Sequence, residues 1–156
     1  MNAALIGRKP EAAKACADMD EASVRSATEA WIAAFNRADA AAMAALYDPQ
    51  AVLWGTTATQ LITTPQGIAA YFDAVFALQP VPRMALVEAL PRVFGDVAVS
   101  SGRYTLALSP APHLREVPAR FSFTYRRTAG VSGLWRIVDH HSSAMPAPLA
   151  ALAAAA

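Results

Sequence analysis

WRIVDHHSSAMP, residues 135–146, is the stretch that joins an apolar strand pattern to a dense polar end. Trp135, Ile137 and Val138 lead into two histidines and two serines, and only one further histidine occurs in the chain. Because successive side chains of a strand point to opposite faces, so dense a polar run needs hydrogen-bond partners or a pocket. A histidine held on a rigid strand beside hydroxyl groups suits proton transfer or the binding of a small polar ligand.

Four more apolar runs predict strands. Residues 83–90, 97–108 and 117–128 precede the polar stretch and are separated by turn signals rich in Gly, Pro, Ser and Asp. A shorter run, residues 51–56, comes earlier in the chain. Consecutive strands joined by short turns are typical of an antiparallel sheet.

Helical spacing of apolar residues dominates the first half of the chain. Residues 20–38 carry one apolar stripe at steps of three and four, and residues 39–47 and 64–76 repeat this spacing after a capping residue. Helices followed by a run of strands predict an α+β fold. We expect a curved, mostly antiparallel sheet wrapped around the long amphipathic helix, with a cavity at its open end.

Composition limits the classes of function. The chain has 156 residues, 55% of them hydrophobic, which suits one domain with a sizeable core. Its net charge is +1 without a basic stripe, which argues against nucleic acid and membrane surfaces as partners. No stretch approaches the roughly 20 apolar residues that cross a bilayer, and the first residues lack the order of a signal peptide. We expect a soluble, cytoplasmic protein.

Two low-complexity ends bracket the predicted domain. Residues 1–18 are rich in Ala and lack an apolar face, which predicts a flexible arm that is helical in part. Residues 147–156 consist mainly of Ala, Pro and Leu and predict a disordered tail. A single domain is therefore expected over residues 19–146.

The polar residues do not form a pattern typical of a metal site. His140 and His141 point to opposite faces of a strand and cannot bind one ion together, and His113 lies in a distant loop. Zinc needs three or four N, S or O ligands, and the lone Cys16 excludes a Cys-rich site or an internal disulfide. We expect neither a metal nor another cofactor, so any hydration chemistry would proceed without metal.

Regular alternation from Trp135 sorts the polar residues onto two faces of the predicted strand. One face carries Asp139, His141 and Ser143, and the other carries Val138, His140 and Ser142. The sequence alone does not decide which histidine enters a cavity. For either one, the structural alternative is that it satisfies backbone groups or a subunit contact.

The same stretch resembles the end of the association (hub) domain of calcium/calmodulin-dependent protein kinase II and its small bacterial relatives. In that family a Trp and an apolar strand precede His-x-Ser and a Pro, and these positions fall on Trp135, His141, Ser143 and Pro146. The doubled His-His-Ser-Ser is similar to the iota-class carbonic anhydrase branch. The resemblance covers about residues 22–146 and implies the cone-shaped nuclear transport factor 2-like fold.

The resemblance implies a catalytic pocket made by Thr56, Tyr71, His141 and Ser143. The hydroxyl groups would position a water molecule and the bicarbonate oxygens. His141 would accept or relay the proton, because its ordinary pKa of roughly 6.5 lies near working pH. The structural alternative is that Thr56 starts a turn and that Tyr71 is a core residue with a polar tip.

Further ligand contacts are expected from Arg120, His140, Ser142 and Tyr104. An arginine on a strand rich in small polar residues suits bidentate binding of bicarbonate or a carboxylate. Arg103 on the preceding strand is a second candidate for this anion anchor. A surface ion pair is the structural alternative for either arginine.

Two classes of function follow from these residues and the resemblance. The first is a stand-alone association-domain-like protein whose small-molecule or anion pocket hydrates carbon dioxide reversibly without metal. The second is a non-enzymatic module that forms a homodimer or a larger homo-oligomer and binds a small carboxylate. An isomerase or hydratase is a third possibility that needs an acid, for which Asp139 is the candidate. No kinase signature is present.

Overall fold

Three helices and five strands make up the computed structural model, which describes residues 9–108, 115–130 and 133–147. The elements are α1 (Lys9–Asn36), α2 (Ala40–Ala44), β1 (Tyr47–Trp54), α3 (Pro65–Phe76), β2 (Arg83–Phe94), β3 (Val97–Ala107), β4 (Glu116–Arg127) and β5 (Trp135–Ala144). The predicted order of helices and strands, and with it the α+β class, is confirmed.

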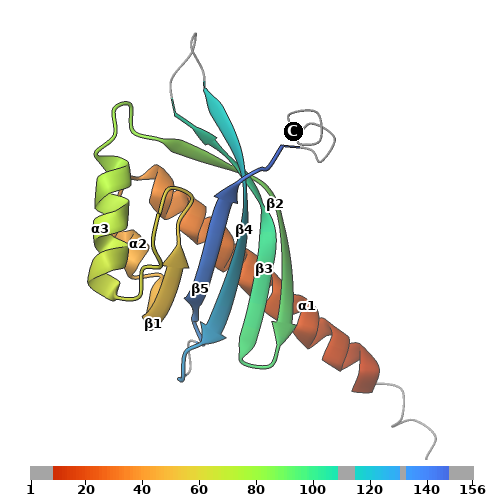
Figure 1. Ribbon diagram of the computed structural model, residues 1–156. Helices are drawn as coiled ribbons and strands as arrows, with labels where there is room; N and C mark the ends of the chain where they lie inside the picture. The colour runs from red at the N-terminus through yellow and green to blue at the C-terminus, as the bar shows by residue number, and fades with distance from the viewer. Residues whose placement is uncertain (1–8, 109–114, 131–132, 148–156) are drawn as a thin grey trace, which may run out of the picture.

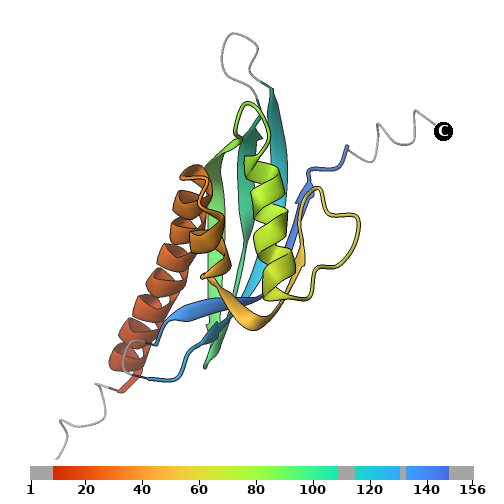
Figure 2. The same ribbon diagram turned by 90° about the vertical axis from the view of Figure 1, so that its left-hand side faces the viewer.

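The strands form one mixed sheet in the order β1-β5-β4-β3-β2. Neighbouring strands are antiparallel except β1 and β5, which are parallel. The long helix α1 crosses one face of the sheet diagonally, and α2 and α3 lie beside its β1 end (Figure 1). Figure 2 shows the helices gathered on this side. We call the face toward α1 the inner face and the opposite one, which no described helix covers, the outer face.

The long helix is positioned by an apolar stripe. Val24, Trp31 and Phe35 are buried against the inner face, and the buried Thr28 continues the same stripe. The helix begins at Lys9, so residues 9–18, which the sequence assigns to a flexible arm, belong to α1, and its first turns project past the sheet (Figure 1). Residues 1–8 of the predicted arm and residues 148–156 of the predicted tail lie outside the described residues.

The first strand begins earlier than its apolar run predicts. The sequence predicts that Asp48 and Pro49 end the second helix, but α2 ends at Ala44 and both residues lie in β1. Proline lacks the N–H that a central strand donates, and β1 accommodates Pro49 because it is an edge strand. Asp48 is held by Arg126, whose Nη2 lies 2.6 Å from its carboxylate.

A β-bulge in β5 decides which way its polar end faces. Thr124 pairs with Asp139, while the next residue of β4, Tyr125, pairs with Ile137, so Val138 is an extra residue on β5. The extra residue reverses the alternation of side chains. Before the bulge, Trp135 and Ile137 face inward, and after it His140 and Ser142 do so.

The bulge corrects the predicted grouping of the polar residues. Regular alternation placed His141 and Ser143 on the same face as Trp135, but they lie on the outer face, and so does Asp139. His141 and Asp139 are exposed, whereas His140 is only 3% exposed. The acid considered for an isomerase or hydratase therefore points away from the interior of the protein.

Candidate functional site

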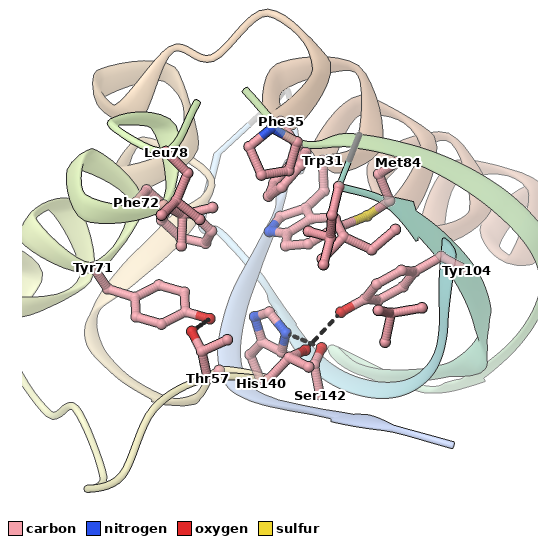
Figure 3. Close-up of a pocket in the computed structure, with 17 residues that line it drawn as sticks. Trp31, Phe35, Thr57, Tyr71, Phe72, Leu78, Met84, Tyr104, His140 and Ser142 are labelled. Atoms are coloured by element: carbon pink, nitrogen blue, oxygen red, sulfur yellow. Dashed lines mark hydrogen bonds between the residues drawn. The ribbon is translucent and has the colours of Figure 1, made fainter. Parts of the chain in front are cut away.

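A cavity of about 200 Å³ lies between α1, α3 and the inner face of the sheet (Figure 3). Its walls are aromatic and aliphatic, contributed mainly by Trp31, Phe35, Phe72, Val75, Leu78, Pro82, Met84, Leu106, Leu108 and Val117. The polar side chains gather at one end and are Thr56, Thr57, Tyr71, Tyr104, His140 and Ser142. This division is typical of a pocket that buries an apolar body and orients one polar group.

A chain of buried hydrogen bonds leads from α1 to this polar end. The indole Nε1 of Trp31 donates to the hydroxyl oxygen of Tyr47 over 3.0 Å. The same hydroxyl lies 2.7 Å from Nδ1 of His140. On the other side of the imidazole, Nε2 lies 2.5 Å from the Ser142 hydroxyl. His140 is thus held by a polar partner at each ring nitrogen.

Two tyrosine hydroxyls extend the polar end along the cavity. The Tyr104 hydroxyl lies 2.9 Å from Oγ1 of Thr56, and the Tyr71 hydroxyl lies 3.3 Å from Oγ1 of Thr57. Burial raises the pKa of Tyr104, and hydrogen bonding with Ser142 and Thr56 opposes this rise. Tyr104 therefore keeps its proton at neutral pH and remains available as a donor.

The imidazole in the cavity is neutral at physiological pH. Burial lowers the pKa of His140 to about 3, and the neighbouring His141 adds to this effect. Burial also raises the pKa of Tyr47 well above its ordinary value. No Asp, Glu, Lys or Arg is among the described residues that line the cavity. The cavity consequently presents only neutral groups to a ligand.

The structure brings some of the predicted site residues together and separates others. Thr56 and Tyr71, predicted as catalytic, line the cavity, as do the predicted ligand contacts Tyr104, His140 and Ser142. Because of the bulge in β5, the predicted pocket pair His141 and Ser143 lies outside it. The predicted placement of that pair was wrong.

The predicted anion anchor also lies on the outer face. Nε of Arg120 donates to the Ser143 hydroxyl over 3.1 Å, and both residues line a shallow depression together with Ser122 and His141. The other candidate, Arg103, pairs with Glu88 at 2.6 Å. Neither arginine lines the cavity, so an anion site at Arg120 would lie on the outer face of the sheet.

Two residues of the site escaped the sequence analysis. Trp31 lies in the apolar stripe predicted for residues 20–38 and Tyr47 at the end of the helix predicted for residues 39–47, yet both belong to the hydrogen-bond chain of His140. Their spacing along the sequence carries no signal of this contact. Gly55 carries a signal only for Tyr71, because a Cβ there would lie 2.3 Å from the Tyr71 hydroxyl and glycine permits this close approach.

Within residues 9–108, 115–130 and 133–147, no three His, Cys, Asp or Glu side chains gather in a way that could hold a metal ion. No helix in the same ranges is long and apolar enough to cross a bilayer.

Helices packed on one face of a curved mixed sheet, around an apolar cavity with one polar end, define a nuclear transport factor 2-like domain. The family model described as "SnoaL-like domain" matches residues 24–148. The chain therefore belongs to the SnoaL-like domain family. No curated protein sequence matches this chain.

Solved structures agree with this assignment. A candidate calcium/calmodulin-dependent protein kinase II association domain from Xanthomonas campestris is 30% identical, with a TM-score of 0.69 over 80% of this chain and 87% of that one. The predicted relationship to association-domain proteins is thus confirmed.

Two further structures share the fold. An NTF2-like protein with a cystatin-like fold from Novosphingobium aromaticivorans has a TM-score of 0.75 at 20% identity, over 96% of this chain and 97% of that one. A candidate dehydratase of the NTF2-like family from Streptomyces avermitilis has a TM-score of 0.72 at 19% identity, over 83% and 99% of the two chains.

The buried imidazole predicts a specific dependence of stability on pH. In the unfolded chain His140 titrates near 6.5, whereas in the folded protein its pKa is about 3. Between these values the unfolded state binds the extra proton, so the free energy of unfolding falls as pH is lowered. From about pH 5.5 to about pH 4, wild type should lose about 1.4 kcal/mol per pH unit more than His140→Gln.

Urea unfolding at a series of pH values measures this difference. His141→Gln is the matched control, because His141 is exposed and His140 stays buried in this variant, so most of the pH slope that His140 causes should persist. Equal slopes for wild type and His140→Gln would show that His140 is not buried in its neutral form.

Proposed function

We propose that this protein is a binding module whose cavity takes a small, neutral, largely apolar molecule with one hydrogen-bonding group. The observation that carries this proposal is the uncharged cavity of about 200 Å³ with its polar side chains at one end. A cavity of roughly 150 Å³ holds benzene, so a molecule of one or two rings suits this space. An anion would lose its hydration there without gaining a cationic partner.

We propose in addition that two or more copies associate through the outer face of the sheet. Directly paired positions form a line across all five strands, from Leu90 through Ser101, Ser122 and His141 to Trp54. Leu90 is 64% exposed and Trp54 is 43% exposed, so apolar groups flank a polar centre. A face of this kind suits a self-complementary contact between identical chains. The similarity to an association domain supports the same proposal.

Binding in the cavity predicts that a larger side chain in its wall weakens the affinity for the ligand. Val117 lines the cavity, so Val117→Phe should occupy part of the space and weaken binding of neutral one- and two-ring compounds by about tenfold or more. Calorimetric titration measures the affinity. Val99→Phe is the control, because alternation on β3 places Val99 on the outer face. Absence of saturable binding by wild type, or equal affinity in both variants, would contradict the proposal.

Self-association predicts a change in oligomeric state when charge enters the outer face. Leu90→Asp places a carboxylate that would lose water in the contact, so the population should shift toward monomer. Sedimentation velocity over a range of concentrations measures this shift. Leu61→Asp, at a residue 42% exposed in the segment before α3, should sediment like wild type. A wild-type protein that is monomeric at every concentration would rule out the contact.

A second candidate function is the metal-free hydration of carbon dioxide. It is favoured by one specific observation: Thr56 and Tyr71 share the apolar cavity with a His-Ser pair, the residue types that the resemblance to the iota class implies. In this proposal the pair is His140 and Ser142, which line the cavity, in place of the predicted His141 and Ser143. With a pKa of about 3, His140 is a poor proton acceptor near neutral pH. The hydroxyl groups would have to relay the proton.

Hydration of carbon dioxide in this cavity predicts that replacing Ser142 and replacing Ser143 have different effects on the rate. Stopped-flow measurement on protein dialysed against chelator should show a rate above that of buffer, and Ser142→Ala should abolish it. Ser143→Ala, on the outer face, should retain the wild-type rate. A wild-type rate equal to buffer, with or without added zinc, would exclude hydration and leave the binding module.

A further inference from the structure

The Tyr47 hydroxyl has two hydrogen-bond partners, Trp31 and His140, and only His140 can accept its proton. The indole N–H of Trp31 can donate but never accept, so the Tyr47 oxygen is the acceptor of that bond. The phenolic proton then needs an acceptor of its own, and Nδ1 of His140 lies 2.7 Å away. Among the described residues, no buried side-chain N or O lacks a hydrogen-bond partner. Tyr47 therefore donates to Nδ1.

This bond selects the tautomer of His140. A neutral imidazole carries one proton, and because Nδ1 accepts, that proton resides on Nε2. Nε2 lies 2.5 Å from the Ser142 hydroxyl and donates to it. The depressed pKa of His140 keeps a second proton off the ring. The hydrogen bonds therefore run in one direction: Tyr47 donates to His140, and His140 donates to Ser142.

The remaining hydroxyls continue in the same direction. Ser142 accepts from His140 and uses its own proton toward Tyr104. Tyr104 then donates to Oγ1 of Thr56, 2.9 Å away. Thr56 is half-buried in the cavity wall, and among the described residues its own proton has no further side-chain acceptor. The chain of hydrogen bonds therefore ends at the Thr56 hydroxyl, which is free to donate to a ligand in the cavity.

We infer that the cavity selects a ligand whose polar group is a hydrogen-bond acceptor, such as the carbonyl of a ketone, aldehyde or ester. This inference rests on the proposed binding function and names its class of ligand. A donor-only group would meet the Thr56 proton and leave two buried donors without an acceptor. Reversing the chain would require Trp31 to accept a hydrogen bond, which an indole N–H cannot do.

The pair formed by Tyr71 and Thr57 is a second polar contact in the cavity. Among the described residues, no donor-only side chain donates to either hydroxyl of this pair, so either one can be the donor in the bond between them. A ligand with a donor group could bind there and hide the preference at Thr56. The binding test is therefore made in wild type and repeated in Tyr71→Phe.

The direction of the chain can be measured without any ligand. Long-range ¹H–¹⁵N spectra of the histidine rings distinguish the two neutral tautomers, and His140 should show its proton on Nε2. Tyr47→Phe removes the donor to Nδ1 and should release this constraint, so that the Nδ1–H form becomes populated. A wild-type His140 protonated on Nδ1 would overturn the inference.

The ligand class is tested with two molecules of similar size, 1-indanone as an acceptor and indole as a donor. Calorimetry in the Tyr71→Phe background should give about tenfold or greater preference for 1-indanone. Tyr47→Phe, which releases the direction of the hydrogen bonds, should weaken the preference, and Thr56→Ser, which keeps the terminal hydroxyl, should retain it. If both molecules bind equally, the inference fails while the binding function stands. If neither binds wild type, the binding function fails and the inference fails with it.

Discussion

The bulge at Val138 is the constraint on which the candidate site depends. Ile137 and Asp139 pair with adjacent residues of β4, so the side chains of β5 change faces within one step. Trp135 therefore packs in the core before the bulge and His140 enters the cavity after it. An unbulged strand that kept Trp135 buried would turn the other histidine inward. One inserted residue thus decides the chemistry of the interior.

Trp31 couples the packing of the core to the polarity of the cavity. Its ring contacts aromatic rings from α3, β3 and β4, as well as the imidazole of His140, while its N–H begins the chain of hydrogen bonds. A buried polar group that loses its partner destabilises a protein by about 1–3 kcal/mol. The packing of the Trp31 ring therefore fixes the first donor of the hydrogen-bond chain, and the hydrogen bond to Tyr47 in turn helps to hold the ring in place.

The sheet separates two chemical environments. Its inner face holds neutral hydroxyls, an uncharged imidazole and aromatic walls, whereas Arg120, Asp139 and His141 lie on the outer face. Charged groups remain where water solvates them, and the cavity keeps a low polarity. This division favours a neutral ligand over an anion, and it removes the acid on which an isomerase or hydratase would depend. The same fold supports many functions, so the site decides between them.

The sequence by itself determined the α+β class, the order of the elements and the family, because helical spacing and strand alternation are local patterns of burial. It also predicted Thr56, Tyr71, His140 and Ser142 as pocket residues, and these side chains line the cavity. Only the tertiary structure decided which histidine faces the cavity, because a bulge depends on pairing between strands rather than on the strand's own sequence. The direction of the hydrogen bonds likewise depends on Trp31 and Tyr47, which folding brings to His140 from far along the chain.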